Sequence, residues 1–293
     1  MKLIIATVLC LFFQGVYGQS LEKLTVPDGT VTYFSAGQGE VILFIHGGQE
    51  DYRVFMPQVE LLSNEFQVVT YSRRYNFPNN NEINGTYNVK TEADDLKVLI
   101  STLKKPVHLV GHSYGGLIAL EFAKNNSDKL KSLTLSEPAL VNWLNEIPNC
   151  ESWAEIVQQQ LINETRDAFV TKDTTLIMKE LFEFFAGADI QNQIPTEVLR
   201  MLKANLREME ALVHSPSGFD APSPEDLKAL DIPKMILTSE KTMPMLKCTN
   251  AKLIEINPLA THHHLLTAGH EMWMTNPKEL AVHLSKFINL QTR

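Results

Sequence analysis

A serine between two glycines, where a buried strand turns into a helix, constrains this chain more than any other feature. Residues 111–116 read Gly-His-Ser-Tyr-Gly-Gly; they follow the apolar run 107–110 and precede the helix-like run 117–123. This strand–turn–helix context is typical of a G-x-S-x-G nucleophile elbow. Side chains at the two glycines of the pattern would collide with neighbouring backbone in so sharp a turn. We therefore expect the Ser113 hydroxyl to project from the strand tip, within reach of a base and a substrate.

Short apolar runs alternate with amphipathic segments on both sides of this turn. Strands are predicted at residues 24–26, 31–34, 41–45, 66–71, 107–110 and 130–135, and a helix at residues 91–103. Asp28-Gly29 favours a hairpin between the first two strands. The continuous apolar run 41–45 is typical of a strand that is buried on both faces. Alternating strands and helices predict right-handed crossovers and a mostly parallel sheet.

The alternation stops between residues 139 and 230. This segment has no convincing buried strand, and it holds amphipathic stretches that predict helices at residues 153–162, 175–185 and 196–212. Its aromatic and Met residues either pack a helical subdomain or line a pocket. Strands are predicted to resume at residues 233–238 and 252–256. The last helix is expected to begin at the Asn276-Pro277 cap and to run to about residue 290.

The first 18 residues have the pattern of a secretory signal peptide. Lys2 is followed by the apolar run 3–13, and small residues precede a cleavage position near Gly18-Gln19. The apolar run is too short to span a membrane, and no other run approaches that length. We therefore expect the protein to be secreted or periplasmic.

Charge and cysteine content limit the partners and the covalent links. The chain has 26 Lys and Arg against 34 Asp and Glu, and its net charge is −8. Its only basic pairs of note are Arg73-Arg74 and Lys104-Lys105, so nucleic acid and anionic membranes are poor partners. Cys150 and Cys248 remain after signal cleavage. In an oxidising compartment they form either a disulfide or two buried free thiols.

Three matches together carry a resemblance to a known family. They are His46-Gly47-Gly48 after an early buried strand, the elbow at residues 111–116, and Gly-His-Glu-Met-Trp at residues 269–273. In order and spacing they resemble the α/β-hydrolase superfamily, and the likeness covers essentially all of residues 21–293.

The resemblance implies an α/β fold with a mostly parallel sheet, of the eight-stranded type, flanked by helices. A helical lid would be inserted after the strand that follows the elbow. The implied organisation is a signal peptide at 1–18, a core at 19–138 and 231–293, and the lid at 139–230.

A serine hydroxyl is a weak nucleophile until a base takes its proton. Among the nine histidines, His270 is the expected base, because it falls in the loop between the last strand and the last helix. The run His262-His263-His264 is expected to be a solvated loop. By resemblance, the backbone N–H groups of Gly48 and Tyr114 would stabilise the developing oxyanion.

The acid that orients the base departs from the family pattern. The family aspartate is expected near Thr242, but residues 232–293 contain no aspartate. Two glutamates are candidates. Glu137 lies at the tip of the strand after the elbow, and Glu240 lies just past the first strand after the lid. The loss of the usual aspartate favours Glu137; a base held only by a carbonyl is the third possibility.

These residues predict a serine hydrolase that cleaves a carboxylic ester, or a lactone, thioester or amide, through an acyl-enzyme. A serine nucleophile disfavours epoxide and haloalkane chemistry, and no metal or organic cofactor is expected. An apolar lid favours a small-molecule substrate with an apolar acyl or alcohol group. Acyl transfer or a lyase step at the same site, and a ligand-binding protein with weak activity, are the alternatives. Arg73 and Arg74 are expected in structural ion pairs rather than on a substrate carboxylate.

Overall fold

A single eight-stranded sheet organises the structure, a computed structural model that describes residues 20–83 and 87–291. The predicted signal peptide at residues 1–18 lies outside the described residues. The strands are β1 (Glu22–Val26), β2 (Gly29–Ala36), β3 (Val41–Ile45), β4 (Gln67–Ser72), β5 (Val107–His112), β6 (Leu130–Ser136), β7 (Lys234–Ser239) and β8 (Thr261–Leu265). Their spatial order is β1-β2-β4-β3-β5-β6-β7-β8.

The first two strands are the antiparallel part of this sheet. β1 and β2 form the predicted hairpin, with Val26 paired to Gly29, and β2 runs antiparallel to β4. Every pairing from β4 across to β8 is parallel. The carboxyl ends of β3, β5, β6 and β7 therefore meet at one edge, where a parallel sheet of this kind presents its ligand-binding loops.

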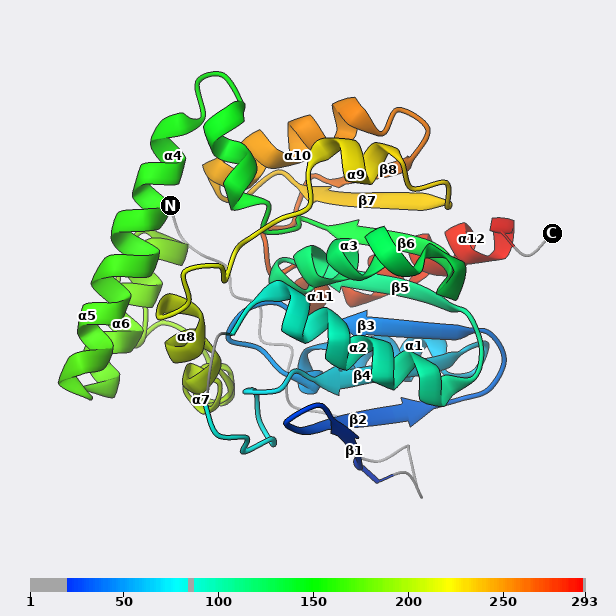
Figure 1. Cartoon of the computed structure of the whole chain (residues 1–293), viewed down its shortest axis with the longest axis horizontal. Helices are drawn as coiled ribbons and strands as arrows, with labels where there is room; N and C mark the ends of the chain where they lie inside the picture. The colour runs from blue at the N-terminus through cyan, green and yellow to red at the C-terminus, as the bar shows by residue number, and fades with distance from the viewer. Residues whose placement is uncertain (1–19, 84–86, 292–293) are drawn as a thin grey trace.

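Helices cover both faces of the sheet (Figure 1). The helices of this core are η1 (Tyr52–Phe55), α1 (Met56–Leu62), α2 (Val89–Leu103), α3 (Tyr114–Asn126), η2 (Ser127–Lys129), α10 (Pro244–Ile256), α11 (Met272–Thr275) and α12 (Pro277–Gln291). Alternate residues of β3 face opposite layers. Val41, Leu43 and Ile45 belong to the core beneath α2 and α3, whereas Ile42 and Phe44 belong to the core beneath α1 and α12. This explains why a strand buried on both faces reads as a continuous apolar run.

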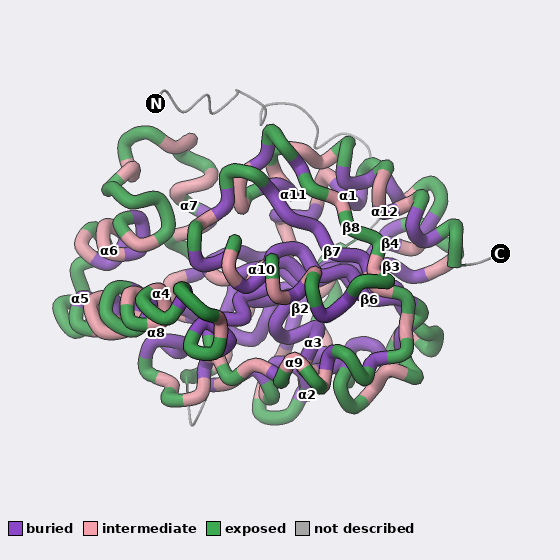
Figure 2. The backbone as a smooth tube through the Cα atoms, turned by 90° about the horizontal axis from the view of Figure 1, so that it is seen from above, coloured by how far each residue is buried: buried purple, intermediate pink, exposed green. Residues whose placement is uncertain are grey.

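The chain between β6 and β7 is helical in the described structure. Its helices are η3 (Val141–Glu146), α4 (Glu151–Ile156), η4 (Val157–Glu164), α5 (Thr165–Thr171), α6 (Thr174–Ala186), α7 (Thr196–Ala204), α8 (Leu206–Val213) and α9 (Pro224–Lys228). Figure 1 shows α4–α8 gathered beyond one end of the sheet. In Figure 2 the tubes of α4–α7 are mostly intermediate or exposed, whereas most of α8 and the inner strands of the sheet are buried. The three helical stretches predicted here are present.

Two predictions for the last quarter of the chain are wrong. Residues 252–256 form the end of helix α10 and not a strand. The buried residues of α10, among them Leu246, Asn250 and Leu253, recur at helical spacing. A short stretch rich in Leu and Ile at the end of this helix cannot be told from a strand without that longer period. The strand in this place is β8, whose run His262-His263-His264 was predicted to be a solvated loop. As the edge strand beside β7, β8 needs only one paired side and tolerates polar side chains.

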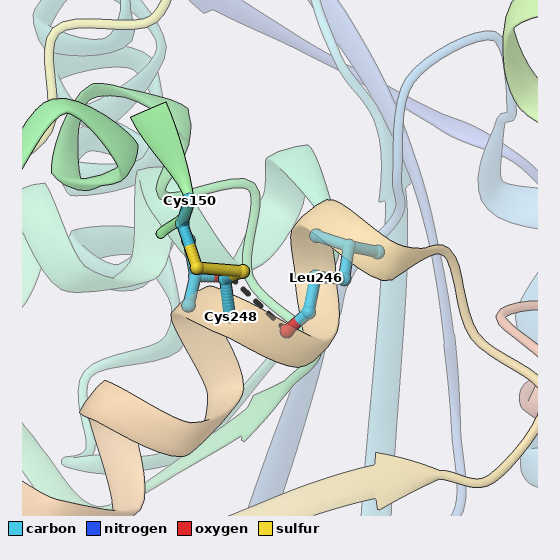
Figure 3. Close-up of a disulfide and its surroundings, with 4 residues drawn as sticks. Cys150, Leu246 and Cys248 are labelled. Atoms are coloured by element: carbon cyan, nitrogen blue, oxygen red, sulfur yellow. Dashed lines mark hydrogen bonds between the residues drawn. A yellow bond between two sulfur atoms is a disulfide. The ribbon is translucent and has the colours of Figure 1, made fainter. Parts of the chain in front are cut away.

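A disulfide ties the helical segment to the core. Cys150 directly precedes α4, and Cys248 lies in α10; their Cα atoms are 6.3 Å apart (Figure 3). The covalent loop spans 98 residues and contains most of the chain between β6 and β7. Within residues 20–83 and 87–291, no helix combines the length and the apolar character that crossing a bilayer requires.

The disulfide is expected to stabilise the docked helical segment. Replacing both cysteines with alanine should lower the free energy of unfolding by about 2–4 kcal/mol, because the open chain regains the entropy of a long loop. Urea unfolding of the wild type and of Cys150→Ala/Cys248→Ala measures this difference. Reductant should destabilise the wild type and leave the double variant unchanged. Equal midpoints for both proteins without reductant would contradict the expectation.

Candidate active site

The turn from β5 into α3 holds Ser113 in a backbone conformation that few residues adopt. Its φ is 51° and its ψ is −119°, and α3 begins at the next residue. Strain of this kind persists only where the surroundings impose it, and it concentrates at functional sites. The Ser113 residue is partly exposed, whereas the residues on either side of it are buried. The predicted elbow geometry is thus present.

The glycines around Ser113 are required by close backbone packing. A Cβ on Gly111 would lie 2.4 Å from the carbonyl oxygen of Gly115. A Cβ on Gly115 would lie 2.3 Å from the carbonyl oxygen of Ile45, at the end of β3. Each distance is far below van der Waals contact, so any side chain at these positions would push α3 away from the sheet.

His270 and Glu137 meet at this edge of the sheet. Nδ1 of His270 lies 2.7 Å from Oε2 of Glu137, although 133 positions separate the two residues. Glu137 is fully buried at the end of β6, and the His270 side chain keeps 17% of its surface exposed. Since the carboxylate accepts a hydrogen bond from the Nδ1–H group, Nε2 carries the free lone pair that a general base needs.

The carboxylate of Glu137 is held by three further hydrogen bonds. Oε1 accepts the Ser239 N–H at 2.7 Å and the Ser239 hydroxyl at 2.9 Å, and Oε2 accepts the Thr242 hydroxyl at 2.7 Å. Thr242, at the expected position of the family aspartate, therefore supports a carboxylate supplied by another strand. Glu240 lies elsewhere: its carboxylate is 3.1 Å from Nε2 of His264, with 58% of its side chain exposed.

Electrostatics favour the charge distribution of an imidazole–carboxylate pair. Burial alone lowers the pKa of His270, but the hydrogen bond and charge of Glu137 outweigh it and raise this pKa above its ordinary value. Burial acts to raise the pKa of Glu137, yet the hydrogen bonds from His270, Thr242 and Ser239 outweigh it and keep that pKa low. Glu137 is therefore an anion that can stabilise an imidazolium.

The His270 ring lies beside the elbow. Its centroid is 4.6 Å from that of His112, the residue immediately before Ser113. The His-Gly-Gly turn closes the site from the other side: a Cβ on Gly47 would lie 3.2 Å from Cβ of Ser113 and 3.3 Å from Cδ2 of His112. The elbow, the His270 ring and the His-Gly-Gly turn thus lie together at this edge of the sheet.

In the turn after β3, the Gly48 N–H lies between two backbone donors that are held by carboxylates. The Gly47 N–H donates to Oε2 of Glu50, and the Gln49 N–H donates to Oε2 of Glu208, at 2.8 and 2.9 Å. Between them, the Gly48 N–H has no acceptor among residues 20–83 and 87–291, and the same holds for the Tyr114 N–H in the first turn of α3. Free N–H groups at these two positions form the type of site that receives an oxyanion.

Glu50 is a site residue that the sequence analysis missed. Its buried carboxyl holds the His-Gly-Gly turn, and its electrostatic neighbours include His270 and Arg73. Burial raises the pKa of Glu50 to about 7, against the opposing effect of the Gly47 hydrogen bond and the nearby positive charges. Its place three residues after Gly47 was the available signal, but nothing in the sequence distinguishes this carboxyl from a solvated one.

Arg73 and Arg74 form structural ion pairs, as expected. Nη2 of Arg73 lies 3.0 Å from Oε1 of Glu208, and both side chains are fully buried. Nη2 of Arg74 lies 2.8 Å from Oδ1 of Asp95. Neither guanidinium is free to bind a substrate carboxylate. Among the described residues, no cluster of His, Cys, Asp and Glu forms a metal site.

Two bacterial hydrolases are similar to parts of this chain in sequence. An uncharacterized hydrolase, YraK, of Bacillus subtilis (strain 168) is 34% identical over 137 residues, which are 45% of this chain and 50% of that protein. The chain thus spans only half the length of this relative. The putative carbamate hydrolase RutD of Pantoea ananatis is 24% identical over 229 residues, which are 76% of this chain and 78% of that protein.

Solved structures share the fold at low sequence identity. MenH from S. aureus superposes with a TM-score of 0.72 at 17% identity, over 89% of this chain and 99% of that one. The enol-lactonase from Burkholderia xenovorans LB400 superposes with a TM-score of 0.69 at 17% identity, over 92% of this chain and all of that one.

The family profile described as the alpha/beta hydrolase fold matches residues 40–277 and so covers the elbow, the His-Gly-Gly turn and His270. This chain belongs to the α/β-hydrolase family.

Proposed function

We propose that the protein is a secreted serine hydrolase that cleaves carboxylic esters or related acyl bonds through an acyl-enzyme. Ser113 is the nucleophile, His270 the general base and Glu137 the acid that orients it. The observation that carries this proposal is the 2.7 Å contact between His270 and the buried Glu137, beside a serine held at a strained turn. The disulfide supports an oxidising compartment, in keeping with a signal peptide at residues 1–18.

The proposed first half-reaction forms a bond between Ser113 Oγ and the acyl carbon. His270 Nε2 accepts the hydroxyl proton, and Glu137 stabilises the resulting imidazolium. The carbonyl oxygen becomes an anion that the N–H groups of Gly48 and Tyr114 bind. When the tetrahedral intermediate collapses, the bond to the leaving oxygen breaks and His270 returns its proton to that oxygen.

The second half-reaction repeats these steps with water. His270 takes a proton from water, hydroxide adds to the acyl carbon, and collapse breaks the bond to Ser113 Oγ. The proton returns to Ser113, and a carboxylic acid leaves. No step requires a group from outside the chain other than substrate and water.

We further propose that residues 139–230 form a lid over the core at residues 19–138 and 231–293, and that this lid favours apolar substrates. Met209 of α8 faces the oxyanion turn: its sulfur would lie 3.8 Å from a Cβ on Gly48. Met178 of α6 accepts a hydrogen bond from the Gln49 side chain. An apolar surface beside the free donors suits a small or medium acyl or alcohol group. The names of the relatives, a putative carbamate hydrolase and an enol-lactonase, support acyl chemistry in general.

A panel of p-nitrophenyl esters of graded acyl length tests the activity and the acyl preference together. The wild type is expected to hydrolyse the short and medium chains best, and Ser113→Ala should lose this activity. Circular dichroism checks that the variant is folded. Equal rates for the wild type and Ser113→Ala would show that the serine does not carry the reaction.

Replacing Glu137 with glutamine is expected to lower turnover by about three to four orders of magnitude, because an amide cannot stabilise an imidazolium. The pH profile should move as well. His270 must be neutral to act as a base, so kcat/KM falls as the pH drops through its pKa, which Glu137 raises above 6.5. In Glu137→Gln that rise disappears, and the acid limb of the profile should shift to lower pH.

Glu240→Gln is the matched control, since Glu240 contacts His264 and is exposed. It should retain both the turnover and the pH profile of the wild type. If Glu137→Gln keeps the turnover of the wild type and Glu240→Gln is inactive, the acid is Glu240. A loss of turnover in Glu137→Gln without any shift of the acid limb would indicate damage to the fold and not to the pair.

A further inference from the structure

A buried ion pair forms hydrogen bonds with the turn that carries the Gly48 donor. One partner of the pair comes from the core and the other from the helical segment. Arg73 follows β4, and Glu208 lies in α8. Both side chains are fully buried, and their charged atoms are 3.0 Å apart. A desolvated pair fixes geometry strongly, because removing either partner leaves an uncompensated charge in the interior.

The guanidinium of Arg73 holds the peptide unit to which the Gly48 N–H belongs. Its Nη2 donates to the carbonyl oxygen of Gly47 at 2.9 Å. In a trans peptide the C=O of one residue and the N–H of the next point in opposite directions. Fixing the Gly47 carbonyl therefore fixes the direction of the Gly48 N–H.

His46 is the second donor to this carbonyl. Nε2 of His46 accepts the backbone N–H of Arg73, so the ring proton is on Nδ1, which lies 2.8 Å from the Gly47 oxygen. The core thus holds the Gly47 carbonyl through His46 without any residue of the helical segment. The Arg73 side chain adds the connection to the helical segment.

Glu208 holds the peptide that follows Gly48. Its Oε2 accepts the N–H of Gln49, whose φ of 60° lies in the left-handed region. A side chain that accepts this N–H keeps it out of the site and stabilises a conformation that costs free energy in a non-glycine residue. The pair therefore bonds to the peptide groups before and after the Gly48 N–H.

The same arginine also contacts the residue that supplies the second donor. The Arg73 guanidinium carbon lies 4.9 Å from the ring centroid of Tyr114, and the Tyr114 hydroxyl donates to the Gly218 carbonyl at 2.7 Å. Gly218 precedes α9 in the helical segment. Both halves of the candidate oxyanion hole thus contact Arg73.

The junction of α7 and α8 docks on these loops through further buried hydrogen bonds. Nδ2 of Asn205 donates to Asp51 at 2.7 Å, and its Oδ1 accepts the N–H of Phe77 at 2.7 Å. Asn205 and Glu208 are both fully buried. Polar groups that are paired across this interface hold it in one register, since each loses a hydrogen bond if α8 moves away.

We propose that Arg73 and Glu208 are positioning residues that orient the Gly47–Gly48 peptide, so that the oxyanion hole is complete only while α8 is docked on this turn. The proposal rests on the proposed hydrolase function for its kinetic consequence. Its structural consequence, the orientation of one peptide, is independent of that function. A helical segment that completes the site when it closes would couple substrate enclosure to catalysis.

The decisive variant is Arg73→Met/Glu208→Gln. It removes both charges of the pair, and the glutamine can still accept the Gln49 N–H. A second buried carboxylate, Glu92, has its Oε1 3.5 Å from Nη1 of Arg73. Burial raises the pKa of Glu92 to about 7, against the opposing charge of Arg73, so Glu92 is expected to take up a proton when the arginine is removed. Replacing a buried ion pair with neutral groups of similar volume is often neutral for stability. If Arg73 and Glu208 only stabilise the fold, this double variant should keep the activity of the wild type. If they orient the Gly47–Gly48 peptide, the double variant should lose activity although it is folded. The matched control is Arg74→Met/Asp95→Asn, which removes the adjacent buried pair that does not touch the turn.

We expect the double variant to unfold at the urea midpoint of the wild type and to lose kcat by about 10- to 100-fold with little change in KM. This loss is smaller than the 10²–10³-fold cost of deleting a whole donor, because His46 still holds the Gly47 carbonyl. A crystal structure of the variant should show the Gly47–Gly48 peptide rotated. The control variant should retain kcat and the peptide orientation.

The proposal is overturned if the double variant keeps the wild-type kcat, if the control loses as much, or if the peptide keeps its orientation without the pair. Should the wild type hydrolyse no ester, the proposed function fails, and the orientation of the peptide in the variant still decides the positioning role.

Discussion

The contact between Gly115 and the end of β3 is the constraint on which the rest of the site depends. With 2.3 Å between a Cβ at this position and the Ile45 carbonyl oxygen, α3 approaches the sheet as closely as only glycine allows. This approach brings the His-Gly-Gly turn next to Ser113 and leaves the N–H groups of Gly48 and Tyr114 without acceptors in the described part of the chain. The strained backbone of Ser113 is the local consequence.

A second feature is the position of the carboxylate that we propose as the acid. β6 ends at the same edge as β5, and its next residue, Glu137, reaches His270 while Ser239 and Thr242 satisfy its remaining lone pairs. Thr242, near the position where the family aspartate was expected, is part of this support. A fully buried carboxylate without such donors would take up a proton.

How much the sequence predicts depends on the range of each interaction. The elbow and the β1–β2 hairpin are local patterns, and the structure contains both. The strand predicted at residues 252–256 is the end of helix α10, whose last turn is rich in Leu and Ile. The loop predicted at residues 262–264 is the edge strand β8, which lacks the apolar run of an inner strand. Glu208 could not be found from sequence, since its partner Gln49 lies 159 positions away. Glu50 lies only three positions from Gly47, but nothing in the sequence shows that its carboxyl is buried. The proposed triad was accessible because its residues follow strand ends, whose positions the topology fixes.

The most direct measurement is the labelling of the folded protein with a fluorophosphonate probe, followed by mass spectrometry of its peptides. The account predicts one phosphonylated residue, Ser113, and much slower labelling in His270→Asn, because the hydroxyl then lacks its base. A folded wild type that resists the probe, or that carries the label on another residue, would contradict the account.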